Sequence, residues 1–211
     1  MTKLNRPREE FFNVLTHGTG AILSIAAASV LIAIAALRGS AMEIVAASIF
    51  GFSLILLYSA STIYHAISSL RYKRIFKRLD HLCIYILIAG TYTPVALLGL
   101  RGTWGWVLFG LAWGFAVLGF VFKFSMLRKS EKLSLALYGI MGWMAVIAIK
   151  PLLENVDHNA LLLILAGGLC YTLGIYFYAN DKKKYHHAIW HIFVLGGSAF
   201  HFFGIFWYLI P

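Results

Sequence analysis

The sequence predicts an all-α integral membrane protein, a bundle of seven transmembrane helices in a single domain spanning residues 1–211. The first observation is composition, because 61% of the 211 residues are hydrophobic and only 12% are charged. Soluble domains carry about 45–50% apolar and about 25% charged residues. A soluble enzyme, a disordered chain and a secreted disulfide scaffold are therefore excluded. The second observation is that long apolar runs fill nearly the whole chain, and the third is the uneven distribution of basic residues.

Seven runs lack Asp, Glu, Lys and Arg and approach the roughly 20 residues that a spanning helix needs. The first run is longer than the core of a signal peptide, about 7–15 residues, so we interpret it as a retained span. Pro94 is expected to bend the third span. Gly110 and Gly114 are expected to let a neighbouring backbone come close. The predicted spans are 18–37, 44–64, 82–100, 102–122, 133–149, 159–180 and 187–210.

The basic residues predict the orientation of the bundle. The chain has 18 Lys and Arg against 8 Asp and Glu, and only Arg38, Arg101 and Lys150 lie in the odd-numbered connections between spans. The positive-inside rule then places the N-terminus in the cytoplasm and the C-terminus outside, which suits a multi-pass protein of a bacterial inner membrane. The rule also accounts for the net charge without a nucleic-acid partner. The other basic residues are Lys3, Arg6, Arg8, Arg71, Lys73, Arg74, Lys77, Arg78, Lys123, Arg128, Lys129, Lys132, Lys182, Lys183 and Lys184.

Histidines supply the candidate functional residues, because ionisable groups in membrane spans are costly and rare. His187 and His191 are four residues apart, so they share one helix face about 6 Å apart along the axis. Two imidazoles in that arrangement can bind one metal ion. His65 ends the second span at the same cytoplasmic depth and would complete a three-histidine zinc site, which keeps a fourth position open for water. Interfacial histidines can also simply snorkel, so spacing alone leaves both interpretations open.

Two further residues lie near this depth. Asp80 could hold the water, act as a general base or orient a ligand imidazole. Ser61 precedes His65 by one turn and could donate a hydrogen bond to a developing oxyanion, or bond back to its own helix. His186 is turned about 100° from its neighbour and is expected at the interface. His158 is expected to be solvated in an outer loop.

Other polar residues surround the predicted site. Glu10, Asn13 and His17 form a polar face that leads into the first span, where they could support the ligands from behind or cap the bundle. His201 lies about 15 Å along its helix from the histidine pair, too far to share a metal. Together with Ser198, it could line a cavity above the site or form hydrogen bonds between packed helices, and we favour the second.

Three motifs then resemble a known family, the progestin and adipoQ receptor superfamily, and most closely its bacterial haemolysin III branch. The first is Glu-x-x-Asn-x-x-Thr-His, which ends at His17. The second is Ser61-x-x-x-His65 followed by Leu79-Asp80. The third is His187-x-x-x-His191 with the trailing Ala-Phe-His-Phe that contains His201. The resemblance covers the whole chain and extends to the adiponectin receptors and the alkaline ceramidases.

The resemblance implies a zinc ion near the cytoplasmic face, held by His65, His187 and His191, with Asp80 and Ser61 beside the water. It implies a zinc-dependent hydrolase of a membrane lipid amide or ester that serves membrane homeostasis. The alternative is a non-enzymatic sensor of membrane state with structural zinc. Cytolysis by pore formation is disfavoured, because no charged ring lines any span.

Overall fold

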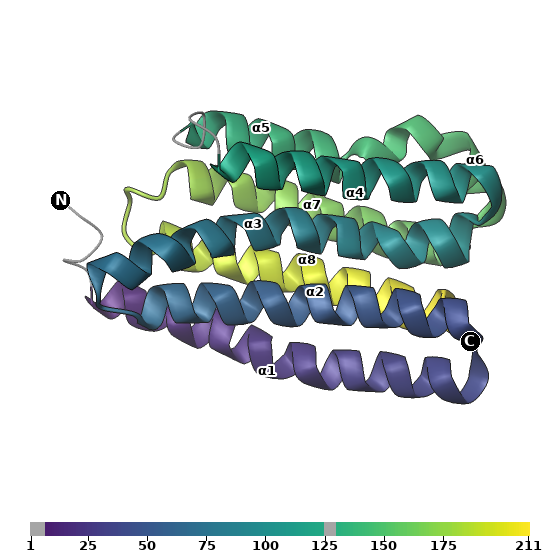
Figure 1. Ribbon diagram of the computed structural model, residues 1–211, viewed down its shortest axis with the longest axis horizontal. Coiled ribbons are helices and arrows are strands. Elements are labelled where there is room, and N and C mark those ends of the chain that lie inside the picture. Colours follow the sequence, from purple (N-terminus) through teal and green to yellow (C-terminus); the bar gives the residue numbers. More distant parts are fainter. Residues whose placement is uncertain (1–6, 125–129) are drawn as a thin grey trace.

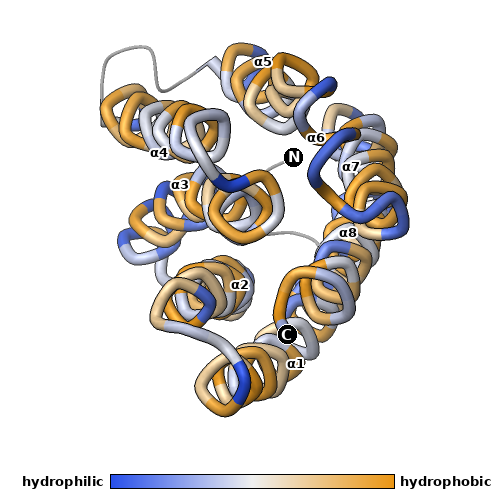
Figure 2. The backbone as a smooth tube through the Cα atoms, turned by 90° about the vertical axis from the view of Figure 1, so that its right-hand side faces the viewer, coloured by the Kyte–Doolittle hydropathy of each residue, from blue (hydrophilic) through white to orange (hydrophobic). Residues whose placement is uncertain are grey.

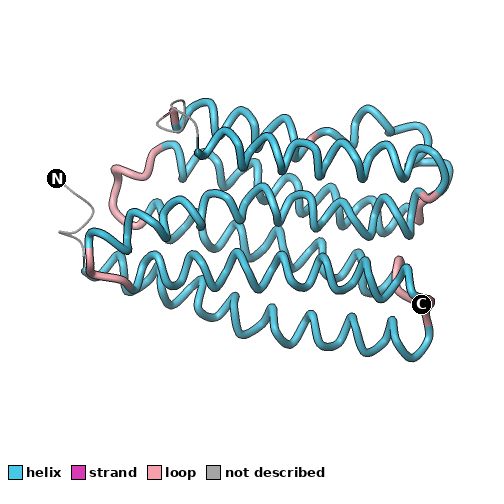
Figure 3. The backbone as a smooth tube through the Cα atoms, viewed as in Figure 1, coloured by secondary structure: helices cyan, strands magenta, loops and turns pink. Residues whose placement is uncertain are grey.

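The computed structural model describes residues 7–124 and 130–211, which fold into helices joined by short connections (Figure 3). No strand occurs in these two segments. Two spans are composite: a π-helical turn extends the third, and a 3₁₀ stretch joins the two α-helices of the fifth. The elements are α1 (Pro7–Arg38), α2 (Ala41–Ala66), α3 (Leu70–Pro94), the π-helix Val95–Leu100, α4 (Gly102–Phe124), α5 (Glu131–Gly142), the 3₁₀-helix Met144–Ala148, α6 (Ile149–Asn155), α7 (His158–Ala179) and α8 (His186–Tyr208).

Seven membrane-spanning segments, as predicted, are found within the described part of the chain. The helices extend beyond the predicted apolar runs at one end of the bundle. α1 begins at Pro7 rather than at residue 18, and α3 begins at Leu70 rather than at residue 82. A search for uncharged runs misses these turns, because charged side chains at a membrane interface can point outward from a continuous helix.

Two prolines explain where the helices change type. Proline lacks the N–H that bonds to the carbonyl four residues earlier, and its ring crowds that carbonyl. At Pro94, where the sequence predicts a bend, α3 gives way to the π-helix. Pro151, in the first turn of α6, cannot bond to the carbonyl of Ile147, and the 3₁₀ stretch that contains Ile147 ends at Ala148.

The expectation for Gly110 and Gly114 is wrong for contacts within this chain. A Cβ atom added at either glycine would meet nothing within 4 Å among the described residues. The close approach occurs at Gly51 of α2 instead, where an added Cβ would lie 2.6 Å from the Cβ of Ala28 on α1. Spacing identified two small residues on one helix face, but not whether that face has a neighbour.

The spanning segments pack side by side around the long axis of the bundle, and the start of α1 and the C-terminus lie at opposite ends of it (Figure 1). Viewed along this axis, the helices are arranged around the centre of the bundle, and α8 lies next to α1 (Figure 2). Hydrophobic residues occur along each helix. α3 is the most buried of the seven segments. It contributes to both hydrophobic clusters of the core, one with α1, α2 and α8 and one with α4 to α7.

One end of the bundle brings together the elements that carry the polar motifs. α1 and α8 begin there and α2 ends there (Figure 1). We call it the histidine end. The backbone N–H of Tyr185, in the left-handed conformation just before α8, donates to the Glu9 carboxylate of α1 at 3.3 Å. Four of the basic residues that predict the orientation, Lys3, Arg6, Arg128 and Lys129, lie outside the described residues.

Candidate metal centre

Three buried histidines converge at the histidine end of the bundle. His65 comes from the last turn of α2, and His187 and His191 come from the first turns of α8. One ring nitrogen from each lies within 4.8 Å of the other two, a geometry that could hold a metal ion. The Nε2 atoms of His65 and His187 are 3.2 Å apart.

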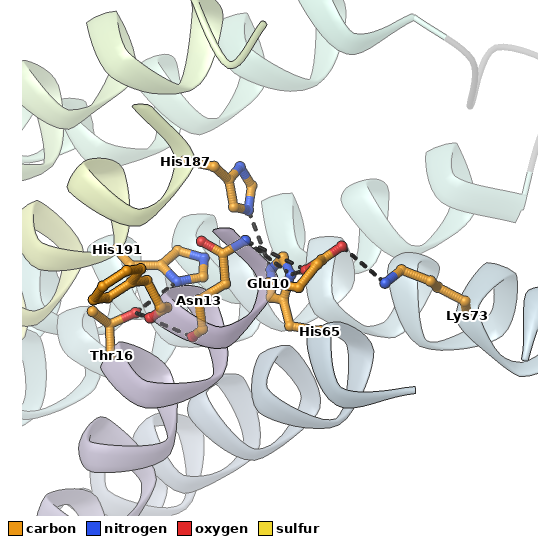
Figure 4. A network of polar contacts seen from close by, with 8 residues as sticks. Glu10, Asn13, Thr16, His65, Lys73, His187 and His191 are labelled. Atoms are coloured by element: carbon orange, nitrogen blue, oxygen red, sulfur yellow. Dashed lines mark hydrogen bonds and ion pairs between the residues drawn. The ribbon is translucent and has the colours of Figure 1, made fainter. Parts of the chain in front are cut away.

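The hydrogen bonds of His65 determine which of its ring nitrogens can bind a cation. Its Nδ1 lies 2.5 Å from a carboxylate oxygen of Glu10 (Figure 4). A carboxylate only accepts hydrogen bonds, so this Nδ1 carries the proton and Nε2 presents a lone pair. A carboxylate behind a ligand imidazole also orients the ring and raises its basicity.

His191 is arranged in the same way by a different partner. Its Nδ1 lies 3.1 Å from the hydroxyl of Thr16. That hydroxyl has its own backbone acceptors, the carbonyl oxygens of Phe12 at 2.8 Å and Asn13 at 3.1 Å, so it accepts from His191. The Nε2 of His191 therefore also presents a lone pair. It is buried and has no hydrogen-bond partner within the described segments.

The three histidines fit a metal ion on these grounds. The Nε2 atoms of His65 and His191 converge with a third imidazole in a buried pocket, and a buried lone pair without a donor, as on Nε2 of His191, is destabilising. Three imidazoles with one further position open are the ligand set of catalytic zinc sites such as that of carbonic anhydrase.

α1 forms the wall behind the site. Glu10 also accepts from the ammonium group of Lys73 at 2.9 Å, so its two carboxylate oxygens hold α2 and α3 at once. Asn13 donates to the same carboxylate at 3.4 Å. The ring of His17 stacks on that of His191, with centroids 3.5 Å apart and planes 14° apart. The polar face of α1 therefore contacts His65 and His191 directly.

The remaining predicted site residues occupy separate positions. Ser61 is fully buried one turn before His65, and its hydroxyl has no hydrogen-bond partner among the described residues. Asp80 is buried in α3, 2% exposed. α3 begins at the histidine end with Leu70, so Asp80 lies about 15 Å along the helix from there. The structure thus brings Asp80 toward the same end of the bundle.

Ser198 and His201 form hydrogen bonds between helices, the interpretation favoured from the sequence. Ser198 accepts from the hydroxyl of Tyr58 at 2.7 Å and contacts that of Tyr171 at 2.9 Å. The Nε2 of His201 lies 3.0 Å from the backbone carbonyl of Ile164. His201 lines a cavity as well, so the two interpretations are not exclusive for this residue.

Sequence reasoning missed the roles of two residues. Thr16 was identified only as part of a motif, and Lys73 only as a charge that sets orientation. The signal for Thr16 was its spacing, since it lies about one helical turn after Asn13 in α1. No signal in the sequence pairs Lys73 with Glu10. His158 is exposed at the start of α7, as expected, and His186 is half-buried against Phe177.

A cavity of about 170 Å³ begins beside this cluster and extends along the inside of the bundle. His17 lines it at the histidine end, and His201 lines it deeper in. Most of its wall is aliphatic or aromatic. Gly139 and Gly142 of α5 and Gly168 of α7 line one side, where an added Cβ would meet nothing within 4 Å.

Fold and site together define the class: a seven-helix membrane protein with a buried three-histidine cluster that could hold a metal ion. The profile of the family described as Haemolysin-III related matches residues 5–202, and the chain belongs to this family. It is 46% identical to Hemolysin-3 of Bacillus cereus, over 100% of this chain and 97% of the relative. It is 45% identical to the Hemolysin-3 homolog of Bacillus subtilis (strain 168), over 96% and 95%.

More distant similarity extends to animals. The human monocyte to macrophage differentiation factor is 30% identical over 79% of this chain and 71% of that protein. No solved structure matches the chain significantly.

Glu10→Gln tests how the ligands are supported. The amide keeps the shape of the side chain but loses the charge that holds the proton on Nδ1 of His65. We expect zinc affinity to fall about 10- to 100-fold, as is typical when a carboxylate behind a ligand histidine is lost. Competition with a fluorescent zinc chelator measures it. Glu154→Gln, in an exposed pair with Lys150, is the matched control and leaves the affinity unchanged. Unchanged affinity in Glu10→Gln would contradict the role of Glu10.

Proposed function

We propose that the protein is a zinc-dependent hydrolase of a membrane lipid, cleaving an amide or ester bond at the cytoplasmic side of a bacterial inner membrane. The observation that carries the proposal is the position of two ring nitrogens, Nε2 of His65 and Nε2 of His191. Their lone pairs point toward the third buried imidazole, beside an apolar cavity. A site that joins a three-imidazole ligand set to an apolar cavity suits a substrate with a reactive carbonyl and a long apolar chain.

Zinc in such a site polarises a carbonyl group and lowers the pKa of a water molecule toward neutrality. Asp80 accepts the proton of the attacking water and passes it to the nitrogen or oxygen of the leaving group. Ser61 donates a hydrogen bond to the carbonyl oxygen as negative charge develops on it, which its buried hydroxyl, without a partner in the described part of the chain, is suited to do. The C–N or C–O bond breaks, and the products are a fatty acid and an amine or alcohol.

Three residues of α1 position the ligand histidines: Glu10, Thr16 and His17. Glu10 and Thr16 hold the ligand rings in the tautomer that presents Nε2. His17 stacks on His191 and lines the cavity, so its ring lies between the ligands and the lipid chain.

The lipid enters from the bilayer between α5 and α7. The cavity wall is thin there because it contains three glycines, Gly139, Gly142 and Gly168. The indole N–H of Trp143 donates a hydrogen bond to the hydroxyl of Thr172 across this part of the wall, at 3.1 Å. A lipid that reaches the site through the membrane never has to transfer its chain into water, which would cost about 0.8 kcal/mol for each methylene group.

One further observation favours a second candidate function. The three histidines come from two helices, α2 and α8, and α1 contacts them through Glu10 and Thr16. A metal there would tie three helices together, as the structural zinc of a non-enzymatic membrane sensor would. We do not propose pore formation, although the name of the two bacillary relatives implies haemolysis for those proteins. A conducting pore needs a polar lining, and this cavity has a mainly apolar one.

The experiment reconstitutes the purified protein in vesicles of bacterial lipid extract doped with one amide lipid and one ester lipid. We expect release of free fatty acid, measured by mass spectrometry, which stops when a chelator strips the metal and resumes when zinc is restored. A lower Tm after stripping with no product under any condition would contradict the hydrolase and support the structural role.

A further inference from the structure

His201 carries a buried acceptor that nothing in the described protein satisfies. Its Nε2 faces the carbonyl oxygen of Ile164, which can only accept, so Nε2 is the nitrogen that bears hydrogen. In the neutral ring Nδ1 is then a lone pair. This Nδ1 is buried and has no hydrogen-bond partner in the residues that the structure describes. Such atoms are rare in folded proteins and point to an unassigned partner.

The position of the ring is fixed by the surrounding sequence. A Cβ added at Gly167 of α7 would lie 2.3 Å from Cδ2 and 2.4 Å from Nε2 of His201, so the ring occupies the space that this glycine leaves. Tyr171, one turn further along α7, packs edge-on against it with centroids 5.4 Å apart. Tyr171 in turn needs the space left by Gly197. The absence of side chains at Gly167 and Gly197 therefore leaves the space that the rings of His201 and Tyr171 occupy.

The other hydrogen-bonding groups deeper in the cavity have partners within the protein. The hydroxyls of Thr91 and Thr172 bond to their own helices, and those of Tyr92, Tyr138 and Tyr171 reach Gly142, His81 and Ser198. Among these cavity-lining groups, the Nδ1 of His201 is the one buried atom that has no hydrogen-bond partner of any kind in the described residues, whereas each of the hydroxyls already has one. It lies ten residues, or about 15 Å, along α8 from His191.

We propose that His201 accepts a hydrogen bond from a hydroxyl group midway along the acyl chain of the lipid in this cavity. The inference rests on the lipid-binding part of the proposed function and not on hydrolysis. A buried water would need two to four polar partners, whereas a hydroxyl carried on an acyl chain is held there by the apolar wall and needs only this one. The site would thus select chains by where they are hydroxylated.

The test measures binding of free fatty acids to the purified protein in detergent, by tryptophan fluorescence. The probes are stearic acid and two hydroxystearic acids, one with the hydroxyl beside the carboxyl group and one with it in the middle of the chain. None has an amide or ester, so binding is measured apart from hydrolysis. We expect the mid-chain isomer to bind about tenfold more tightly than stearic acid, and the other isomer to bind as stearic acid does.

His201→Gln separates recognition from packing. Its terminal amide can still donate to the Ile164 carbonyl from the place of Nε2, but the acceptor at Nδ1 is gone. We expect the tenfold preference to vanish while the affinity for stearic acid stays within about twofold. In His201→Asn, the side-chain oxygen can take the place of Nδ1 and restore part of the preference. His158→Gln, at an exposed histidine, is the matched control.

Three results would overturn the inference. The first is that the wild type binds the mid-chain hydroxystearic acid no more tightly than stearic acid. The second is that His201→Gln loses affinity for these two acids equally, and the third is that no fatty acid binds at all. Hydrolysis is scored separately in vesicles. Absence of hydrolysis with the preference intact would refute the enzyme and leave His201 as a site of chain recognition.

Discussion

His65→Ala is expected to release the metal, reduce lipid hydrolysis to the level of empty vesicles and lower the Tm. The variant leaves only the two histidines of α8, so a metal no longer joins α2 to α8. It also leaves the Glu10 carboxylate with Lys73 and Asn13 as its partners, without the imidazole. A metal present at one hundred times its Kd stabilises a folded protein by about 2.7 kcal/mol, so the fall in Tm should match that of the chelated wild type.

His186→Ala is the matched control for this variant. His186 is the immediate neighbour of a ligand and contacts Phe177 instead of the cluster. We expect its metal content and turnover to equal those of the wild type. Full turnover in His65→Ala would refute the assignment of this histidine to the centre.

Asp80→Asn is expected to keep the metal and the fold while hydrolysis falls by about 10²- to 10⁴-fold. The amide has the shape of the carboxylate but cannot accept the proton of an attacking water, and general base catalysis contributes a factor of this size. Initial rates in reconstituted vesicles measure it, with zinc content determined on the same samples.

Asp157→Asn is the control for the same chemical change at the other end of the bundle. Asp157 caps α7 by accepting from the backbone N–H of Asn159, and asparagine caps a helix equally well. Two results would argue against Asp80 as the base. One is an unchanged rate, and the other is loss of zinc from Asp80→Asn, which would make this residue a support for the metal.

Much of the site could be predicted from the sequence, because helix geometry and depth in the membrane are both readable there. The four-residue spacing of His187 and His191 fixes their shared face, and the apolar runs give the depth of His65. Those two facts place the three histidines at one depth, and their convergence depends in addition on how α2 and α8 pack. The side of α1 that carries Glu10, Asn13 and His17 could be read in the same way.

The rest depends on which helix faces meet. Glu10 reaches His65 across 55 positions of sequence, and Lys73 reaches Glu10 from the start of α3, a segment that the apolar runs left out. Helices that are apolar all round give no periodic signal of their inner face, so the cavity and the position of His201 on its wall could not be derived. For the same reason, Gly110 and Gly114 suggested a close contact that is not found among residues 7–124 and 130–211.

The most direct test of the metal centre is elemental analysis of the purified wild-type protein beside the double variant His187→Ala/His191→Ala. The arrangement of the lone pairs predicts close to one zinc per chain in the wild type and close to none in the variant, with both proteins equally monodisperse. No zinc in the wild type after purification without chelators, or equal zinc in both proteins, would contradict it.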